Sequence, residues 1–424
     1  MHIHVVQSGD TLWKLANRYS VSIQQIVTAN GLSVTDTLVI GQALVIPTSD
    51  HDHIVVPGES LWQIAKRYGT TPEAIAQANQ LENMNRIQIG QRLRIPSASL
   101  PSKEVNAYLT NLGSVGQSMI DQVGYDLTYV SPFSYEARSD GSLKGLNDVA
   151  VLSIARSKKV SPLMSITNID AKGFNSELAH VILNNPSVQE TFINNILNLL
   201  TARGYRGLNV DFEYVPSDDR ERYNQFLQLL VNRLHPYEIS VSSALAPKLS
   251  TDQKGLLYEA HDYLRHGQIL DFVVLMTYEW GWAGGAPMAI APLNMVQRVL
   301  DYAVTVIPHH KIMIGIVLYA RDWTLPYVVG GPNARTFSPQ YALQLAARYN
   351  TAIQYDPLSQ SPFFRYTDDQ GRNHEVWFED ARSIQAKFNL VKDYNIRGIS
   401  YWVLPTSFPQ VWPVQEDSFN VIKL

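Results

Sequence analysis

Residues 207–213 read GLNVDFE, a short apolar strand pattern interrupted by polar residues at every second position. Side chains on a strand alternate between its two faces, so Asn209, Asp211 and Glu213 share one face and the apolar residues share the other. An amide and two carboxylates are costly to bury unless they have partners or a chemical task. The segment therefore predicts a buried strand whose polar face points into a site.

Similar apolar runs, separated by helical stretches, flank this segment on both sides. Alternating strands and helices predict βα units in a parallel sheet. The predicted strands are Val105–Leu112, Leu127–Phe133, Leu163–Thr167, Gly207–Phe212, Ile239–Ala244, Phe272–Thr277, Ile312–Val317 and Gly398–Trp402. The clearest predicted helices are Ser187–Thr201, Arg220–Leu234 and Leu293–Val306. We therefore expect a (β/α)8 barrel over residues 104–424, with its functional residues at the carboxyl ends of the strands.

The stretch between the seventh and eighth predicted strands is too long for a simple connection. Residues 364–371 (FRYTDDQG) and the return through residues 376–378 (VWF) have the pattern of a hairpin. We expect a small α+β insertion at about residues 323–378.

An internal repeat precedes the barrel. Residues 4–13 (HVVQSGDTLW) match residues 53–62 (HIVVPGESLW), and the same spacing aligns Asn30 with Asn79. Each copy predicts a strand, two helices and a return strand, with Ser22 as N-cap of the second helix in the first copy. We expect two small modules at residues 3–48 and 52–97, followed by a short linker at residues 97–102.

The composition excludes several classes of protein. The chain has 424 residues, a net charge of −4 and no cysteine, so it has no disulfides or thiol nucleophiles, and nothing in its charge favours nucleic acid or an anionic membrane as a partner. No apolar run has the length of a membrane span or a signal peptide. His2 with His4, and His51 with His53, alternate like metal ligands but lack partner acids. We expect a monomer without metal or cofactor, made without a signal peptide.

The repeats closely resemble the lysin motif (LysM) family. The marks are the VxxGDTLW and VxPGESLW starts, the central Asn30 and Asn79, and the IxxGQxLxIP ends. The resemblance implies that each module binds polymers of N-acetylglucosamine, in peptidoglycan or chitin, between two loops. The residues that it assigns to glycan binding are Gly9, Asp10, Thr11 and Asn30 in the first module and Gly58, Glu59, Ser60 and Asn79 in the second. Alternatively, these residues only fold the modules.

The segment at residues 207–213 resembles the DGxDxDxE signature of glycoside hydrolase family 18. Glu213 matches the general acid/base and Asp211 the preceding aspartate, whereas Arg206 and Asn209 stand where the family usually has aspartates. The resemblance implies that Glu213 protonates the glycosidic oxygen while the 2-acetamido group of the substrate acts as the nucleophile, an exception to the scheme with two carboxylates. Asp211 would orient the acetamide, and the anomeric configuration would be retained.

Three further elements resemble this family at other strand ends. Residues 276–279 (MTYE) resemble its M-x-Y-D element, in which Tyr278 would hydrogen-bond the acetamide and Glu279 replaces the usual aspartate. Trp402 matches the tryptophan beneath the reacting sugar. Ser243 lies in a stretch similar to the substrate-facing segment after the fifth strand, and Trp280 begins the loop after the sixth. The resemblance assigns substrate binding to Asn209, Glu279, Trp402, Trp280 and Ser243.

Within this family, the chain is most similar to bacterial spore proteins that join two LysM modules to the barrel. The resemblance implies an N-acetylglucosaminidase that degrades cortex peptidoglycan and lies in the coat and cortex region of the spore. Two alternatives stay open. One is a chitinase with the same mechanism, and the other is a glycan-binding protein without activity, which the departures at Arg206, Asn209 and Glu279 keep in view.

Overall fold

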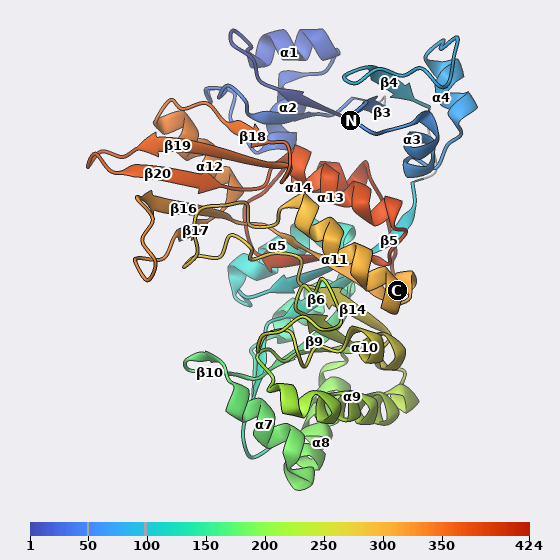
Figure 1. Ribbon diagram of the computed structural model, residues 1–424, viewed down its shortest axis with the longest axis vertical. Coiled ribbons are helices and arrows are strands. Elements are labelled where there is room, and N and C mark those ends of the chain that lie inside the picture. The colour runs from blue at the N-terminus through green and yellow to red at the C-terminus, as the bar shows by residue number, and fades with distance from the viewer. Residues whose placement is uncertain (49–50, 97–99) are drawn as a thin grey trace.

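The computed structural model describes residues 1–48, 51–96 and 100–424. In the last of these ranges, eight parallel strands close a barrel (Figure 1). In sequence order these strands are β5 (Ser102–Leu109), β6 (Tyr129–Pro132), β9 (Ser161–Thr167), β12 (Gly207–Asp211), β13 (Ser240–Leu245), β14 (Phe272–Leu275), β15 (Ile312–Val317) and β21 (Gly398–Leu404). The pairing of β12 with β9 completes the ring, so the predicted fold class is confirmed.

Helices surround the barrel and bury the outward apolar residues of its strands. They are α5 (Ser114–Val123), α6 (Val149–Ser157), α7 (Ser176–Asn184), α8 (Pro186–Arg203), α9 (Arg220–Leu234), α10 (Tyr263–Ile269), α11 (Leu293–Val306), α13 (Ala381–Asp393) and α14 (Val411–Glu416). Short 3₁₀ turns lie at Gly124–Asp126, Ser217–Asp219, His235–Tyr237 and His309–Lys311. The small strands are β7 (Tyr135–Ala137), β8 (Leu143–Lys144), β10 (Ile169–Asp170), β11 (Gly173–Phe174) and β22 (Asn420–Val421).

The predicted strand bounds differ from the observed ones mainly at the strand ends. The first strand was predicted at Val105–Leu112, whereas β5 begins at Ser102 because β22 pairs with its first residues. The sixth strand ends at Leu275, two residues before its predicted end. Apolar residues thus continue past the last ladder hydrogen bond, where they line the loops that follow the strands.

The insertion between β15 and β21 is a five-stranded sheet with one helix. It contains β16 (Ala320–Leu325), β17 (Arg335–Phe337), α12 (Pro339–Arg348), β18 (Gln354–Asp356), β19 (Ser361–Thr367) and β20 (Asn373–Trp377). The predicted hairpin is present, since β19 pairs with β20 in antiparallel register. The sheet begins three residues before the predicted position of 323, because Ala320 already pairs with Phe337 of β17.

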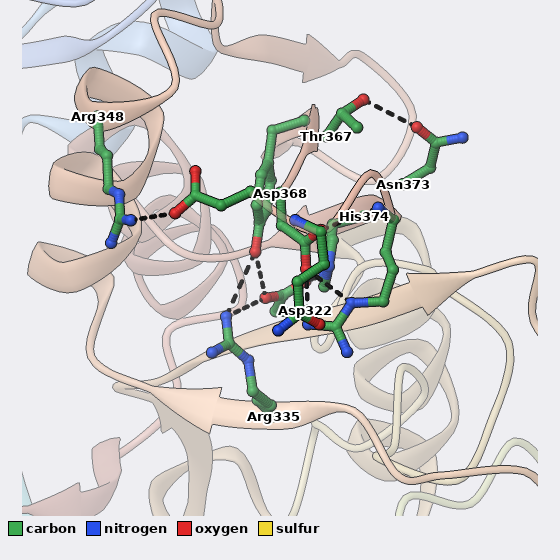
Figure 2. A network of polar contacts seen from close by, with 11 residues as sticks. Asp322, Arg335, Arg348, Thr367, Asp368, Asn373 and His374 are labelled. Atoms are coloured by element: carbon green, nitrogen blue, oxygen red, sulfur yellow. Dashed lines mark hydrogen bonds and ion pairs between the residues drawn. The ribbon is translucent and has the colours of Figure 1, made fainter.

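A buried carboxylate holds the strands of this insertion together. Figure 2 shows Asp322 of β16 between Arg335 and His374, which come from two other strands. The Asp322 carboxylate lies 2.8 Å from His374 Nδ1, accepts a hydrogen bond of 2.8 Å from Tyr366 and forms an ion pair with Arg335. Buried charges require such partners. The network fixes β16 and β17, the two strands that reach the end of the barrel.

The two N-terminal modules have the same fold and lie on the same side of the molecule (Figure 1). The first contains β1 (His2–Val5), α1 (Leu12–Tyr19), α2 (Ile23–Asn30) and β2 (Ala43–Ile46). The second contains β3 (His51–Ile54), α3 (Leu61–Arg67), α4 (Pro72–Ala78) and β4 (Arg92–Ile95). Ser22 is the N-cap of α2, as predicted, and it forms a capping box with Gln25. The predicted linker at residues 97–102 lies partly outside the described residues.

Candidate active site

A cavity of about 480 Å³ opens at the carboxyl ends of the barrel strands. Its walls come from strands or following loops around the ring and from the insertion. The lining residues are Tyr108, Phe133, Ile169, Phe174, Asp211, Glu213, Ala244, Met276, Tyr278, Glu279, Tyr319, Arg321, Thr336, Trp402 and Val403. The volume and the mixture of aromatic and acidic groups are those of a small-molecule or sugar site.

The alternation predicted along β12 places its acidic residues at the barrel interior. Phe212 points outward and stacks on Phe192 of α8 and Phe226 of α9, with ring centroids 6.4 and 6.1 Å apart. On the opposite face, Asp211 and Glu213 line the cavity. The packing of Phe212 against two helices therefore fixes the direction in which both carboxyl groups point.

Asp211 is a buried carboxyl without a hydrogen-bond partner for one oxygen. Its side chain is 4% exposed, and among the described residues no donor contacts its Oδ1. Burial raises the pKa of Asp211 to about 7. A carboxyl in this state can exchange a proton or receive a hydrogen bond from a bound ligand.

Glu213 follows the end of β12, and the side-chain amide of Asn168 bonds both its backbone N–H and its backbone carbonyl. Its N–H donates to Asn168 Oδ1 at 3.0 Å, and Asn168 Nδ2 donates to its carbonyl at 2.9 Å. Burial raises the pKa of Glu213 well above its usual value, and the charges of Asp211 and Glu279 raise it further. The raised pKa favours the protonated carboxyl, which is the form that a general acid requires.

The Tyr278 ring lies against β15, where Gly315 has no side chain to exclude it. A Cβ on Gly315 of β15 would lie 2.3 Å from the Tyr278 ring, and Thr277 donates to the Gly315 carbonyl at 3.0 Å. Tyr278 is 9% exposed and lines the cavity together with Asp211 and Glu213. Burial raises the pKa of Tyr278, so it stays a neutral hydrogen-bond donor.

We expect the Gly315→Ala substitution to displace Tyr278 and to lower kcat by about tenfold, the scale of a misplaced positioning group. Its methyl group cannot fit beside the aromatic ring without a shift of that ring. Gly145→Ala is the matched control, because a Cβ there would meet no atom within 4 Å. Steady-state kinetics would check the prediction, and an unchanged kcat in Gly315→Ala with the fold intact would contradict it.

Glu279 is held by the insertion. Its carboxylate accepts a hydrogen bond from Tyr319 and forms an ion pair of 2.6 Å with Arg321. Arg321 also donates to Thr336 at 3.0 Å, and Thr336 follows Arg335 in the sequence of β17. The prediction missed Tyr319, Arg321 and Thr336, because nothing in the sequence marked the insertion as a wall of the cavity.

An aromatic cluster forms another wall. The Trp402 ring lies edge-to-face against Phe133 and Tyr108, with centroids 4.9 and 5.5 Å apart. Indole and phenol rings offer flat apolar faces to sugars while their polar groups remain available for hydrogen bonds. Trp402 was predicted in this place, whereas Tyr108 and Phe133 could have been found from the aromatic residues near the ends of the first two predicted strands.

Three predicted substrate-binding residues do not line the cavity. Asn209 is buried beneath it, where it accepts from Tyr108 at 2.8 Å and donates to Ser242 at 3.0 Å. Ser243 points outward from β13, and its hydroxyl lies 3.0 Å from His266 Nδ1, so its predicted sugar contact is wrong for this structure. Trp280 packs against the barrel core. Asn209 shares the inward face of Asp211 but lies one layer deeper in the barrel, whereas Ser243 lies on the outward face of its strand.

The predicted glycan-binding residues of the modules have structural contacts of their own. Asn30 is fully buried, and its side chain bonds Ile26, Val45 and Gln410, so a direct sugar contact by Asn30 is excluded in this structure. Asn79 makes the corresponding bonds to Ile75 and Arg94 but is only half-buried.

The loops opposite these asparagines are held by matching contacts. Asp10 and Glu59 each accept from a backbone N–H and lie 2.8 and 2.7 Å from a histidine. Thr11 and Ser60 cap the helices that follow. Gly9 and Gly58 have φ values of 83° and 85°, with open space where a Cβ would be.

Neither a metal cluster nor a spanning helix occurs in the part of the chain that the structure describes. No three His, Asp or Glu side chains there gather as metal ligands. Likewise, no helix among these residues is long and apolar enough to cross a membrane.

Comparison with known proteins matches both parts of the chain. The family model described as glycosyl hydrolases family 18 matches residues 106–406, and the LysM domain model matches residues 4–47 and 53–96. A cortical fragment-lytic enzyme of Bacillus subtilis is 51% identical over 427 residues, covering 100% of this chain and 99% of the relative.

Solved structures agree with these matches. The crystal structure of the Bacillus cereus spore cortex-lytic enzyme SleL has a TM-score of 0.92 and 42% identity, covering 100% of this chain and 99% of that one. A chitinase of Chromobacterium violaceum has a TM-score of 0.68 and 25% identity, covering 75% and 99%. The cavity at the barrel strand ends and the matches across the whole chain lead to one conclusion. This chain belongs to glycoside hydrolase family 18 and is a glycoside hydrolase with two N-terminal LysM domains.

Proposed function

We propose that this protein is a retaining N-acetylglucosaminidase that cleaves peptidoglycan of the spore cortex, or fragments of it. The observation that carries the proposal is the position of Glu213, whose carboxyl has a raised pKa and shares one cavity with Asp211 and Tyr278. The names of the relatives with cortical and cortex-lytic activity support this choice of substrate.

Each of the three residues would have one task in the first step. Glu213 gives its proton to the glycosidic oxygen as the bond to C1 breaks. The carbonyl oxygen of the 2-acetamido group attacks C1 from the opposite side and forms an oxazolinium ion. Asp211 accepts the amide N–H and balances the positive charge, while the Tyr278 hydroxyl donates to the acetamide oxygen. In the second step Glu213 removes a proton from water, which attacks C1 and restores the acetamide with retained configuration.

The other carboxyl groups of the cavity are poorly placed to act as nucleophiles. Glu279 is tied to Arg321 and Tyr319. Asp211 lies on the same strand face as Glu213, two residues before it, and is 4% exposed. A double displacement needs a free carboxylate across the sugar from the acid. This arrangement supports the substrate-assisted route.

We further propose that the LysM modules hold the enzyme on its polymer and that it acts in the spore. Peptidoglycan is insoluble, so a tether raises the local concentration of cleavable bonds by the logic of linked binding. Relatives described as spore cortex-lytic support this location.

The test compares purified cortex fragments with chitin oligomers as substrates. We expect mass spectrometry to find products with N-acetylglucosamine at the new reducing end, released as the β-anomer when followed at once by NMR. Faster cleavage of chitin oligomers would favour the chitinase alternative, to which the similarity to a bacterial chitinase structure draws attention. Binding without cleavage of either polymer would leave only a glycan-binding protein.

A further inference from the structure

The first module is joined to the catalytic part by buried polar contacts. Gln410 at the start of α14 donates to Asn30 Oδ1 at 2.9 Å and to the Ala43 carbonyl at 2.7 Å. Gln340 of α12 donates to the Gly31 carbonyl at 2.8 Å. Because these amides are buried or nearly so, their loss would leave unsatisfied groups at the junction.

Apolar contacts reinforce this junction. Ala43 and Val45 of β2 belong to the continuous hydrophobic core of the barrel, and Val39 belongs to the core of the insertion. Figure 1 shows the first module lying against α13 and the insertion. The face of the first module's sheet that carries Ala43 and Val45 is therefore buried against the catalytic part.

The second module lacks the residues that make such a junction. At a spacing of 49 residues, Val39, Ala43 and Val45 correspond to Gln88, Arg92 and Arg94. Both arginine side chains point to the exposed face of β4. The second module contacts the barrel elsewhere, through α3, where Arg67 forms an ion pair of 2.8 Å with Asp393.

The difference extends to the loop of Gly31, which borders the proposed glycan groove of the first module, and to the loop of Gly41, which precedes β2. A Cβ on Gly31 would lie 2.4 Å from Pro409, and one on Gly41 would lie 1.9 Å from the Ile353 carbonyl. In the second module, a Cβ on Gly90 would meet nothing within 4 Å. Gln80, which corresponds to Gly31, is exposed.

We propose that the two modules have different tasks: the first is a fixed part of the catalytic unit, and the second captures the N-acetylglucosamine chain. This inference rests on the proposed function, since it divides the role of the LysM pair. One wall of the first groove, at Asn30 and Gly31, is fastened to α12 and α14. The second groove, between residues 58–60 and 79–81, makes no direct hydrogen bond to the barrel among the described residues, and Glu59 is linked to α13 only through Arg67, which also pairs with Asp393.

The chain contains no cysteine, so a single introduced cysteine can be labelled to block one groove at a time. Ser8→Cys and Pro57→Cys are matched substitutions at exposed positions directly before Gly9 and Gly58. Each would be made in the full chain with Glu213→Gln, so that the polymer stays intact, and then coupled to a bulky maleimide. Binding to insoluble peptidoglycan sacculi would be measured before and after coupling.

We expect the label at position 57 to weaken binding at least tenfold and the label at position 8 to weaken it less than twofold. Equal losses, or a larger loss from position 8, would overturn the division of tasks, and so would undiminished binding with both labels. If the uncoupled proteins do not bind sacculi, the proposed tether fails. A cleavage assay on soluble fragments with native Glu213 tests the proposed catalytic function separately.

A second measurement addresses the structural role of the first module. Ala43→Arg places in β2 the residue that β4 has at the same position, and it forces a charge into the barrel core. We expect the Tm of the whole chain to fall by at least about 4 °C, whereas Thr37→Arg, at an exposed position of the same module, should leave it unchanged. Equal Tm values for the two variants would contradict a fixed junction.

Discussion

The Glu213→Gln variant is expected to lose hydrolysis of cortex peptidoglycan by a factor of about 100 to 10,000, the usual contribution of a general acid. The amide keeps the size of the side chain but has no proton of suitable acidity. The other two carboxyl groups that line the cavity cannot replace it, because Asp211 is 4% exposed and Glu279 is paired with Arg321. The release of reducing ends from purified cortex fragments would measure the effect.

Binding gives the internal control for this experiment. Glu213→Gln should still bind sacculi as well as the native chain, because the substitution follows β12 of the barrel and lies outside both modules. Glu177→Gln, at an exposed glutamate of α7, is the matched variant and should keep full activity. Full activity in Glu213→Gln would remove the proposed mechanism and with it the assignment of Glu213.

Much of the barrel could be predicted because its strands are apolar and its helices periodic. The predicted bounds of α9 and α11, Arg220–Leu234 and Leu293–Val306, coincide with the observed ones. The repeat indicated the two modules directly. Strand ends were less accurate, because a strand ends where its ladder hydrogen bonds end, and this depends on a neighbouring strand that the local sequence does not contain.

The acidic centre of the site could also be predicted, whereas much of its wall could not. Asp211, Glu213 and Tyr278 lie at or just after strand ends, so the alternation of side chains and the barrel rule place them together. Arg321 and Thr336 reach the cavity from β16 and β17, two paired strands of the insertion that the Asp322–Arg335 ion pair also joins. The network around Asp322 joins residues from β16, β17, β19 and β20, and no local pattern reports their pairing.

The role of Asn30 shows a different limit. The repeat marks Asn30 and Asn79 as equivalent, and both hold their own module together through the same backbone bonds. Only the folded chain shows that Gln410 adds a further bond to Asn30. Equivalent sequence positions thus differ in environment, because one module is packed on the barrel and the other meets it through a different face.

The Asp211→Asn variant should lose activity and gain stability at the same time. We expect kcat/KM to fall by about 100- to 1,000-fold, because the variant removes the charge that balances the oxazolinium ion. Removing the negative charge of Asp211 also lowers the raised pKa of Glu213. The alkaline limb of the remaining activity should therefore move to lower pH, which a pH–rate profile would show.

The stability gain follows from the raised pKa of Asp211. In the unfolded chain this carboxyl ionises near 3.8, whereas in the folded chain its pKa is about 7, so between these values the folded state binds more protons. The contribution of Asp211 to the stability of the native protein should therefore fall as pH rises from about 4 to about 7. The amide of the Asp211→Asn variant carries no charge, so the variant avoids this loss. The pKa shift of Asp211 corresponds to at most about 4 kcal/mol of unfolding free energy, which the variant regains above neutral pH. Thermal unfolding of the native chain and of Asp211→Asn at pH 8 and pH 4 would measure this gain in stability. A larger Tm gain at pH 4 than at pH 8 would show that the ionised Asp211 carboxylate has adequate partners in the folded chain. That result would contradict the burial that makes Asp211 a partner for a cationic intermediate.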